Sequence, residues 1–182
     1  MGLGLATALS VTSPAEAVDA VRKGTMRLGA ERLANIGARL DDPNTAFFMS
    51  ILTTLTSQGI QTIQYPRVGF DYFIIDGLSI GGNAGVSYNS LGTGAFGLAI
   101  LPRVGYAFDL SPTFEFWPRG GVGVQFTDVG GSNSSAVLTL EGMFLIEMVP
   151  HAKFEFGPFL DAAFANGWPI ETGATAGIAI EF

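Results

Sequence analysis

Residues 77–89, GLSIGGNAGVSYN, alternate between two kinds of side chain with a strict period of two. The odd positions are polar or glycine, whereas the even positions are apolar or small: Leu78, Ile80, Gly82, Ala84, Val86 and Tyr88. A period of two belongs to a β-strand with one apolar and one polar face, and about ten such residues cross a bilayer at a tilt. This stretch therefore predicts a membrane-spanning strand.

The same alternation recurs after residue 65, where turn or loop sequences such as Asp76-Gly77 and Pro150-His151 separate the segments. The expected strands are 65–75, 77–89, 95–109, 113–127, 135–148, 152–164 and 171–182. A further strand is expected at 24–40, where only Arg32 and Leu33 break the alternation. That segment resembles an amphipathic helix, but two interior glycines weaken a helix, so counting favours a strand.

Residues 41–63 begin with the turn signal Asp41-Asp42-Pro43-Asn44 and continue as an apolar run without clean alternation. Bacterial barrels have an even number of strands, and a full strand at 46–56 would make nine. We therefore assign 41–63 to a long first loop, which could be ordered or could extend the neighbouring strands. The expected fold class is all-β, a closed antiparallel up-and-down transmembrane barrel of eight strands.

The composition agrees with this fold. The chain is 48% hydrophobic and only 14% charged, yet it contains no run of 18 apolar residues that would form a transmembrane helix. The apolar residues are thus spread over alternating strands. The chain has no cysteine, which excludes disulfides and thiolate metal sites, and its net charge of −7 argues against nucleic acid as a partner.

Residues 1–17 are apolar at first and end in Ala15-Glu16-Ala17, a small-x-small pattern typical of a signal-peptide cleavage site. No Lys or Arg precedes Arg22, so the basic start of a signal peptide is missing, and an N-terminal segment without this role is the alternative. The expected organisation is a signal peptide at 1–17, a periplasmic segment at 18–23 and the barrel at 24–182.

The charged residues indicate which face points outward. Within the strands after residue 65 they lie opposite the row of Phe, Leu, Ile and Val side chains, on a face rich in Gly, Ser, Thr and Asn. A soluble lipocalin-like barrel would instead present many Lys and Glu residues to water. We therefore expect the apolar face to contact lipid, with an aromatic girdle at the strand ends: Tyr72, Tyr88, Tyr106 and Trp168.

The inward face carries a recurrent Pro-Arg pair at Arg67, Arg103 and Arg119. The lumen of an eight-stranded barrel is about wide enough for side chains alone. We therefore expect an ion-pair network that plugs it, formed by Arg67, Asp71, Arg103, Glu115, Arg119, Glu141, Glu155 and Asp161. The alternative is a polar path for small solutes. Trp117 also falls on the inward face, where it could stack on the arginines.

Enzymatic activity is not expected. The only histidine, His151, falls in an expected turn, so no strand supplies a histidine beside a nucleophile, and a lone histidine cannot build a metal site. The sequence thus predicts neither a catalytic site nor a metal or cofactor site.

The strands after residue 65 and the final segment TGATAGIAIEF resemble the small eight-stranded outer-membrane barrels of the OmpA/OmpX type. The pieces PRVGFDYFIIDGLSIGG and PRVGYAFDL resemble a barrel family of myxobacteria-like Gram-negative bacteria. The resemblance implies a location in the bacterial outer membrane, contact with its lipid and lipopolysaccharide, and assembly by the barrel-insertion machinery. It implies an assembly signal at the C-terminus, formed by Phe182, Ile180 and Ile178.

These features favour a structural or interaction protein with a plugged lumen and no catalytic activity. Two alternatives stay open at this point. One is a narrow pore or a transporter for a small apolar molecule that enters near 41–63. The other is the soluble lipocalin-like barrel, with its faces inverted.

Overall fold

The computed structural model describes residues 21, 23–41, 44–51, 66–89, 95–128, 132–164 and 169–182. Among them, no helix is long and apolar enough to cross a membrane. They form ten strands, which are β1 (Met26–Asp41), β2 (Asn44–Ile51), β3 (Arg67–Ile75), β4 (Leu78–Asn89), β5 (Ala95–Tyr106), β6 (Phe108–Ser111), β7 (Phe114–Asp128), β8 (Ser132–Val149), β9 (Ala152–Phe164) and β10 (Ile170–Glu181).

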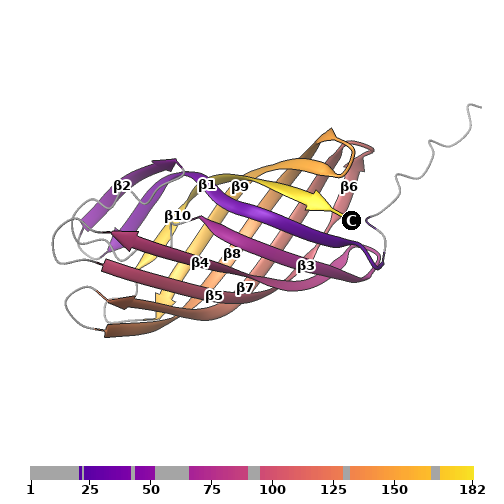
Figure 1. The fold of residues 1–182 in the computed structure, drawn as a ribbon. Coiled ribbons are helices and arrows are strands. Elements are labelled where there is room, and N and C mark those ends of the chain that lie inside the picture. The colour runs from indigo at the N-terminus through magenta and orange to yellow at the C-terminus, as the bar shows by residue number, and fades with distance from the viewer. Residues whose placement is uncertain are drawn as a thin grey trace, which may run out of the picture.

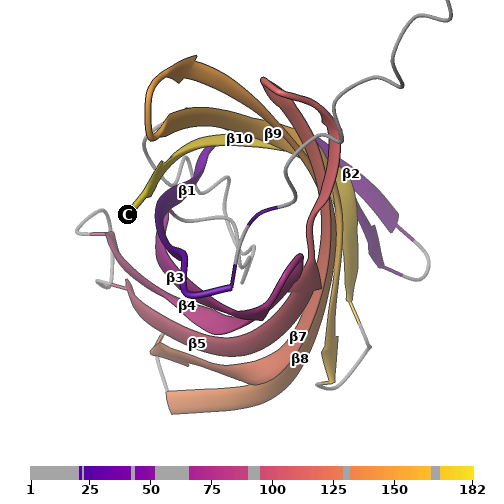
Figure 2. The same cartoon turned by 90° about the vertical axis from the view of Figure 1, so that its right-hand side faces the viewer.

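Eight strand positions, which we call staves, close into one antiparallel barrel (Figures 1 and 2). Seven of them are β1, β3, β4, β7, β8, β9 and β10, and β5 and β6 together make the eighth because both pair with β7. Hydrogen bonds between β1 and β10 close the ring. The predicted eight-stranded up-and-down barrel is therefore confirmed.

The strands are staggered, as closure of a barrel requires. A row of register partners that starts at Arg39 crosses β10, β9, β8, β7, β5, β4 and β3 in turn and returns to β1 at Arg27. The rows therefore climb around the wall from one end of the barrel to the other. We call the end with the tight turns at 76–77, 112–113 and 150–151 the turn end, and the opposite end the loop end.

The long strand β1 changes partner halfway along its length. Met26–Glu31 pairs with β3, whereas Ala34–Asp41 pairs with β2, and the pairing with β10 shifts register between Ala30 and Ala34. Arg32 lies at this bulge with a positive φ of 58°. The two residues that break the alternation in the sequence, Arg32 and Leu33, thus mark a real irregularity of the strand.

Within the expected long loop 41–63, Asn44–Ile51 extend a neighbouring strand, which is one of the possibilities that the sequence left open. These residues form β2, which pairs with β1 as a hairpin at the loop end. The physical reason is that β1 leaves β3 after the bulge, so its free edge can accept another strand there. Residues 52–63 lie outside the described residues. The hairpin adds no ninth stave, so the even count of the barrel is kept.

Side chains alternate between the two faces of the wall along every stave. Charged and polar side chains on the inner face are buried, including the large arginines Arg27, Arg32 and Arg67. Bulky apolar side chains on the outer face are exposed, for example Val68 at 62% and Val122 at 57%. A soluble barrel has the opposite arrangement, so the lipocalin-like alternative does not fit this fold.

The segment before β1 packs into the turn end of the barrel. Val21 is buried against Phe73, Ala107 and Trp117, and its carbonyl accepts a hydrogen bond from the Gly77 amide at 2.9 Å. The Gly24 amide donates to the Phe73 carbonyl at 2.8 Å. Figure 2 looks at this end and shows the indigo segment within the outline of the ring. An apolar layer therefore lies across the lumen between its charged part and the turn end.

Closure between β1 and β10 can be tested with a disulfide, because the chain has no native cysteine. Leu28 and Ile180 are register partners, and facing residues in antiparallel strands lie about 4.5–5.5 Å apart at Cα, within disulfide range. We expect the Leu28→Cys/Ile180→Cys variant to crosslink within one chain under mild oxidation, seen as a mobility change on a non-reducing gel. The control pair Leu28→Cys/Leu140→Cys, on the non-neighbouring strands β1 and β8, should stay uncrosslinked. An open sheet would leave both pairs uncrosslinked.

Candidate functional site: the charged lumen

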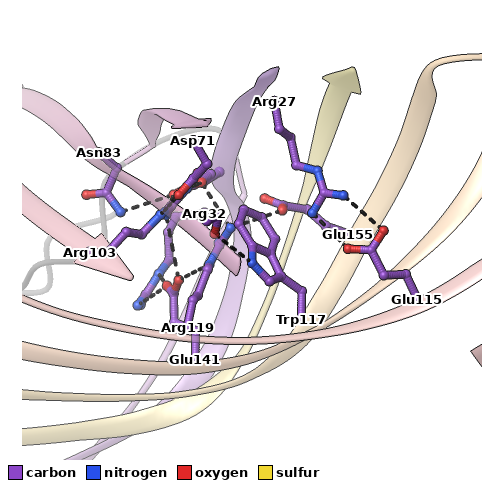
Figure 3. A network of polar contacts seen from close by, with 12 residues as sticks. Arg27, Arg32, Asp71, Asn83, Arg103, Glu115, Trp117, Arg119, Glu141 and Glu155 are labelled. Carbon is purple, nitrogen blue, oxygen red and sulfur yellow. Dashed lines mark hydrogen bonds and ion pairs between the residues drawn. The ribbon is translucent and has the colours of Figure 1, made fainter. Parts of the chain in front are cut away.

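The middle of the lumen is filled by four arginines and five carboxylates. They come from six strands, and we call them the central cluster: Glu31, Arg32, Arg67, Asp71, Arg103, Arg119, Glu141, Glu155 and Asp161. Each of these side chains is 8% exposed or less, so the charges are removed from water and depend on one another. Figure 3 shows several of them pointing toward one another inside the lumen from different strands.

Arg103 on β5 joins carboxylates from two other strands. Its Nη1 donates to Glu31 Oε2 at 2.8 Å and its Nε donates to Asp71 Oδ1 at 3.1 Å, and a further contact to each carboxylate makes both interactions two-pronged. Asn83 adds a 3.1 Å hydrogen bond from Nδ2 to Glu31 Oε2. This fork geometry is the strong form of an arginine–carboxylate pair, so β1, β3, β4 and β5 are tied together across the lumen.

Glu141 on β8 is shared by two arginines. Arg119 Nε donates to its Oε2 at 2.6 Å, and Arg32 Nη2 donates to its Oε1 at 2.8 Å. Arg32 also lies 3.0 Å from Asp161 through Nη1, and Asp161 lies 3.7 Å from Arg67. The bulge at Arg32 therefore has a function in the packing, because it directs this guanidinium into the lumen between Glu141 and Asp161.

Glu155 is held less tightly than Glu141. Its Oε2 lies 3.5 Å from Arg119 Nη1, and Arg119 is already hydrogen-bonded to Glu141 and 3.2 Å from Glu31. Neither Glu155 oxygen has a hydrogen-bond donor among the described residues. Since five carboxylates face four guanidinium groups, Glu155 is the carboxylate in excess.

A second, balanced cluster lies nearer the turn end. Arg27 contacts Glu115 at 2.9 Å and also contacts Glu181, and Lys153 Nζ lies 2.8 Å from Glu115 and 3.0 Å from Glu181. Two cations thus meet two carboxylates in a closed square. Because the four residues come from β1, β7, β9 and β10, this square ties the closing strands to the far wall.

Trp117 separates the two clusters and contacts both. Its indole is 1% exposed, and the guanidinium groups of Arg27, Arg119 and Arg103 lie 4.3, 4.6 and 5.4 Å from the ring centroid. Its Nε1 donates to Ser79 Oγ at 3.3 Å. The expected stacking of arginine on this inward tryptophan is confirmed. Arginine suits this position because its flat cation is attracted to an aromatic face.

Glycines on the inner wall make room for these large groups. A Cβ added at Gly69 would overlap the Glu31 carboxylate, and one added at Gly105 would overlap the Trp117 indole. The narrow lumen can therefore hold this many long side chains only because glycine faces them.

The structure brings seven of the eight predicted network residues into the central cluster or its contacts and places the eighth, Glu115, in the square. Sequence reasoning missed Arg27, Glu31 and Arg32 on β1 and the pair Lys153 and Glu181. Arg27, Glu31, Lys153 and Glu181 could have been found, because all four lie on the inward positions of their strands. Arg32 could not have been found, because the alternation predicts an outward side chain and the bulge turns this side chain inward.

The predicted girdle and assembly residues all belong to the outer wall where they are described. Tyr72 and Tyr106 are exposed near the turn end, as are Ile178, Ile180 and Phe182 on the last strand. Tyr88 lies in β4 but its side chain is outside the described part of the structure, as is all of Trp168. His151 is exposed in the turn after β8. Within the described ranges, no three His, Asp or Glu side chains gather in a metal-binding group.

The carboxylates Glu141 and Glu155 offer a matched test of the network. Glu141→Gln removes the counter-charge of two buried arginines, so we expect a loss of about 3–5 kcal/mol in the free energy of unfolding. Glu155→Gln removes the excess carboxylate, so we expect a change below about 1 kcal/mol. The measurement is urea unfolding in lipid or detergent, followed by tryptophan fluorescence. Equal losses in both variants would contradict the assignment of Glu155 as the charge in excess.

No protein family model matches the chain, and no curated protein matches it. Among solved structures, Neisserial surface protein A is similar, with 16% identity, 88% of this chain and 100% of that chain covered, and a TM-score of 0.59. The N-terminal β-barrel domain of Pseudomonas aeruginosa OprF has 10% identity, 88% and 98% covered, and a TM-score of 0.56. Ail of Yersinia pestis has 10% identity, 88% and 99% covered, and a TM-score of 0.53. The chain thus has the fold of the small eight-stranded outer-membrane β-barrels, as its sequence predicted.

Proposed function

We propose that this protein is an integral outer-membrane β-barrel of structural or interaction type, whose lumen is plugged by the two charged clusters and which carries no catalytic activity. The observation that carries the proposal is the inverted distribution of side chains. Buried charges fill the inside, and a continuous apolar surface covers the outside. Such a surface is stable only against hydrocarbon, and a closed barrel is the one β architecture that leaves no unpaired edge within it.

The direction of the barrel in the membrane follows from its connections. Outer-membrane barrels have short turns on the periplasmic side and longer loops outside the cell. The tight turns of this chain and both ends of the barrel, Met26 and Phe182, lie at the turn end. The turn end thus faces the periplasm, where Phe182, Ile180 and Ile178 would be read by the barrel-assembly machinery. Tyr72 and Tyr106 would then belong to the periplasmic girdle.

The β1–β2 hairpin supports an interaction role at the loop end. Its outer face is apolar and strongly exposed, with Phe47 at 84%, Met49 at 63% and Ile36 at 60%. On its other face, the ring of Phe48 lies 6.4 Å from that of the buried Phe159, so the hairpin is anchored to the lumen. The outer face would contact the acyl chains of lipopolysaccharide in the outer leaflet.

A narrow pore is the alternative for the lumen. Three features support a plug instead: the apolar layer at Val21 and Trp117, the central cluster, and a second apolar cluster of Ala99, Leu101 and Val137 toward the loop end. Ions would have to displace paired charges to pass, and the desolvation cost of such pairs is high.

Membrane insertion is tested first. We expect the folded protein to float with phospholipid vesicles in a density gradient and to migrate differently on a detergent gel before and after boiling, because the closed barrel resists the detergent. The boiled sample is the unfolded control. Identical lanes together with solubility in plain buffer would overturn the membrane location.

The plug is tested by conductance in planar bilayers. We expect almost no steady current through the wild-type protein and a measurable current through Arg119→Ala, which leaves space where three carboxylates and Trp117 now meet one guanidinium. Leu140→Ala, an outward change on β8, is the control and should not conduct. Currents that stay at the wild-type level in both Arg119→Ala and Glu141→Ala would contradict the plug.

A further inference from the structure

A shallow groove runs across the outer wall. Its volume is about 620 Å³, and its lining comes from β4, β5, β7, β8, β9 and β10. Outward side chains form most of the lining, among them Leu78, Pro118, Leu140, Pro158 and Leu160. The groove is therefore mainly a feature of the apolar exterior, and its lining also reaches the wall at the inward residues Arg119, Glu141 and Phe159.

The residue pattern of three neighbouring rows explains the groove. Along one side the wall carries a continuous row of phenylalanines, Phe108, Phe116, Phe144 and Phe156, whose successive members are register partners and whose rings contact one another. Along the other side it carries the row Val104, Gly120, Leu140, Leu160 and Thr172. Between these rows lie the short side chains that form the floor.

The floor consists of Pro118, Gly142 and Pro158. Pro118 and Gly142 are register partners, and a Cβ at Gly142 would lie 3.5 Å from the Pro158 ring. These residues lack long side chains, whereas the phenylalanines and leucines beside them project outward. The floor is thus low and rigid, because proline fixes its own backbone angle.

The path of the groove fits one lipid leaflet. Five inter-strand steps of about 4.8 Å give a length of about 24 Å. Rows perpendicular to strands tilted by about 40° climb roughly 15 Å over this length, which is half of a hydrocarbon core about 30 Å thick. The low end lies at Leu78 and Tyr106, beside the turn 76–77, so the groove begins at the turn-end surface.

The shape distinguishes among occupants. The groove touches six of the eight staves and so curves around more than half of the barrel. A straight transmembrane helix or the convex wall of a second copy would touch only part of it, whereas a flexible chain can follow the curve. The groove is also continuous with the proposed lipid-facing surface, so hydrocarbon has direct access to it.

We propose that this groove is a binding site for one acyl chain of a phospholipid whose headgroup lies at the turn end, in the periplasmic leaflet. The inference rests on the proposed membrane location. The chain lies on Pro118, Gly142 and Pro158, beside Leu140 and Leu160. The phenylalanine row lies next to this lining, with Phe116 nearest to Gly142. Close packing against this rigid floor holds the chain longer than the rest of the lipid-facing wall does.

Gly142 allows the groove to be filled without disturbing the wall. The nearest atoms to an added Cβ are in ordinary contact, at 3.5 Å from Phe116 and Pro158, so a side chain there has space and points outward into the groove. Gly142→Leu therefore fills the floor, and Gly142→Ala fills it in part. Ala84→Leu is the matched control, because Ala84 is an exposed outward residue of β4 that does not line the groove.

The experiment uses the full chain in vesicles that contain a phosphatidylethanolamine with a photoactivatable diazirine in one acyl chain. Only protein that floats with the vesicles and shows heat-dependent gel mobility is irradiated, so failure of the membrane location is recognised before the groove is tested. The crosslinked peptides are mapped by mass spectrometry. We expect crosslinks to concentrate at 116–120, 140–144 and 156–160 relative to the outward residues of β1 and β3, which do not line the groove.

We expect crosslinking at these three segments to fall by roughly half or more in Gly142→Leu, less in Gly142→Ala, and not in Ala84→Leu. Crosslinks spread evenly around the wall, or unchanged by Gly142→Leu, would overturn the inference. Crosslinks that disappear when the protein dimerises would also overturn the inference, because a second copy of the chain would then occupy the groove. If Gly142→Leu does not show heat-dependent gel mobility, the inference is tested by the crosslink map of the wild-type protein and by the loss of crosslinking in Gly142→Ala.

Discussion

The pairing of buried charges inside a narrow lumen is the constraint on which the other features of this protein depend. Four arginines and five carboxylates share the central cluster, and each would be costly to bury alone. Their partners come from strands far apart in sequence, such as Glu31 and Arg103, so the pairs form only when the sheet has closed. Closure and charge pairing therefore stabilise each other.

The same constraint shapes both faces of the wall. Inside, glycine faces the largest groups, as Gly69 does the pair of Glu31 and Arg103, because the lumen has no spare width. Outside, each strand must present apolar side chains, since the polar ones are used within. A wall with this strict division is stable only between an ion-paired interior and hydrocarbon. The packing of the lumen is thereby linked to the proposed location in a membrane.

The outer wall is apolar throughout but is not uniform. Small and rigid residues form the row Pro118, Gly142 and Pro158, and the row beside it consists of phenylalanines. A surface that served only to hold the barrel in lipid would not need neighbouring rows whose side chains differ this much in length. The strands that form the groove also carry the charged clusters that we propose as a plug, so the binding capacity that we propose for this barrel lies on its exterior.

The sequence by itself determined the class of fold, the number of staves and the inner or outer side of nearly every residue, because a strand repeats every two residues and that repeat is local. It predicted the inward arginines and carboxylates for the same reason. Only the tertiary structure decided which charges meet, since a register between strands depends on closure and stagger of the whole ring. It also decided that Arg32 turns inward at a bulge, that β1 leaves β3 to pair with Asn44–Ile51, and that Pro118, Gly142 and Pro158 align in one groove. Each of these depends on neighbours that no local pattern contains.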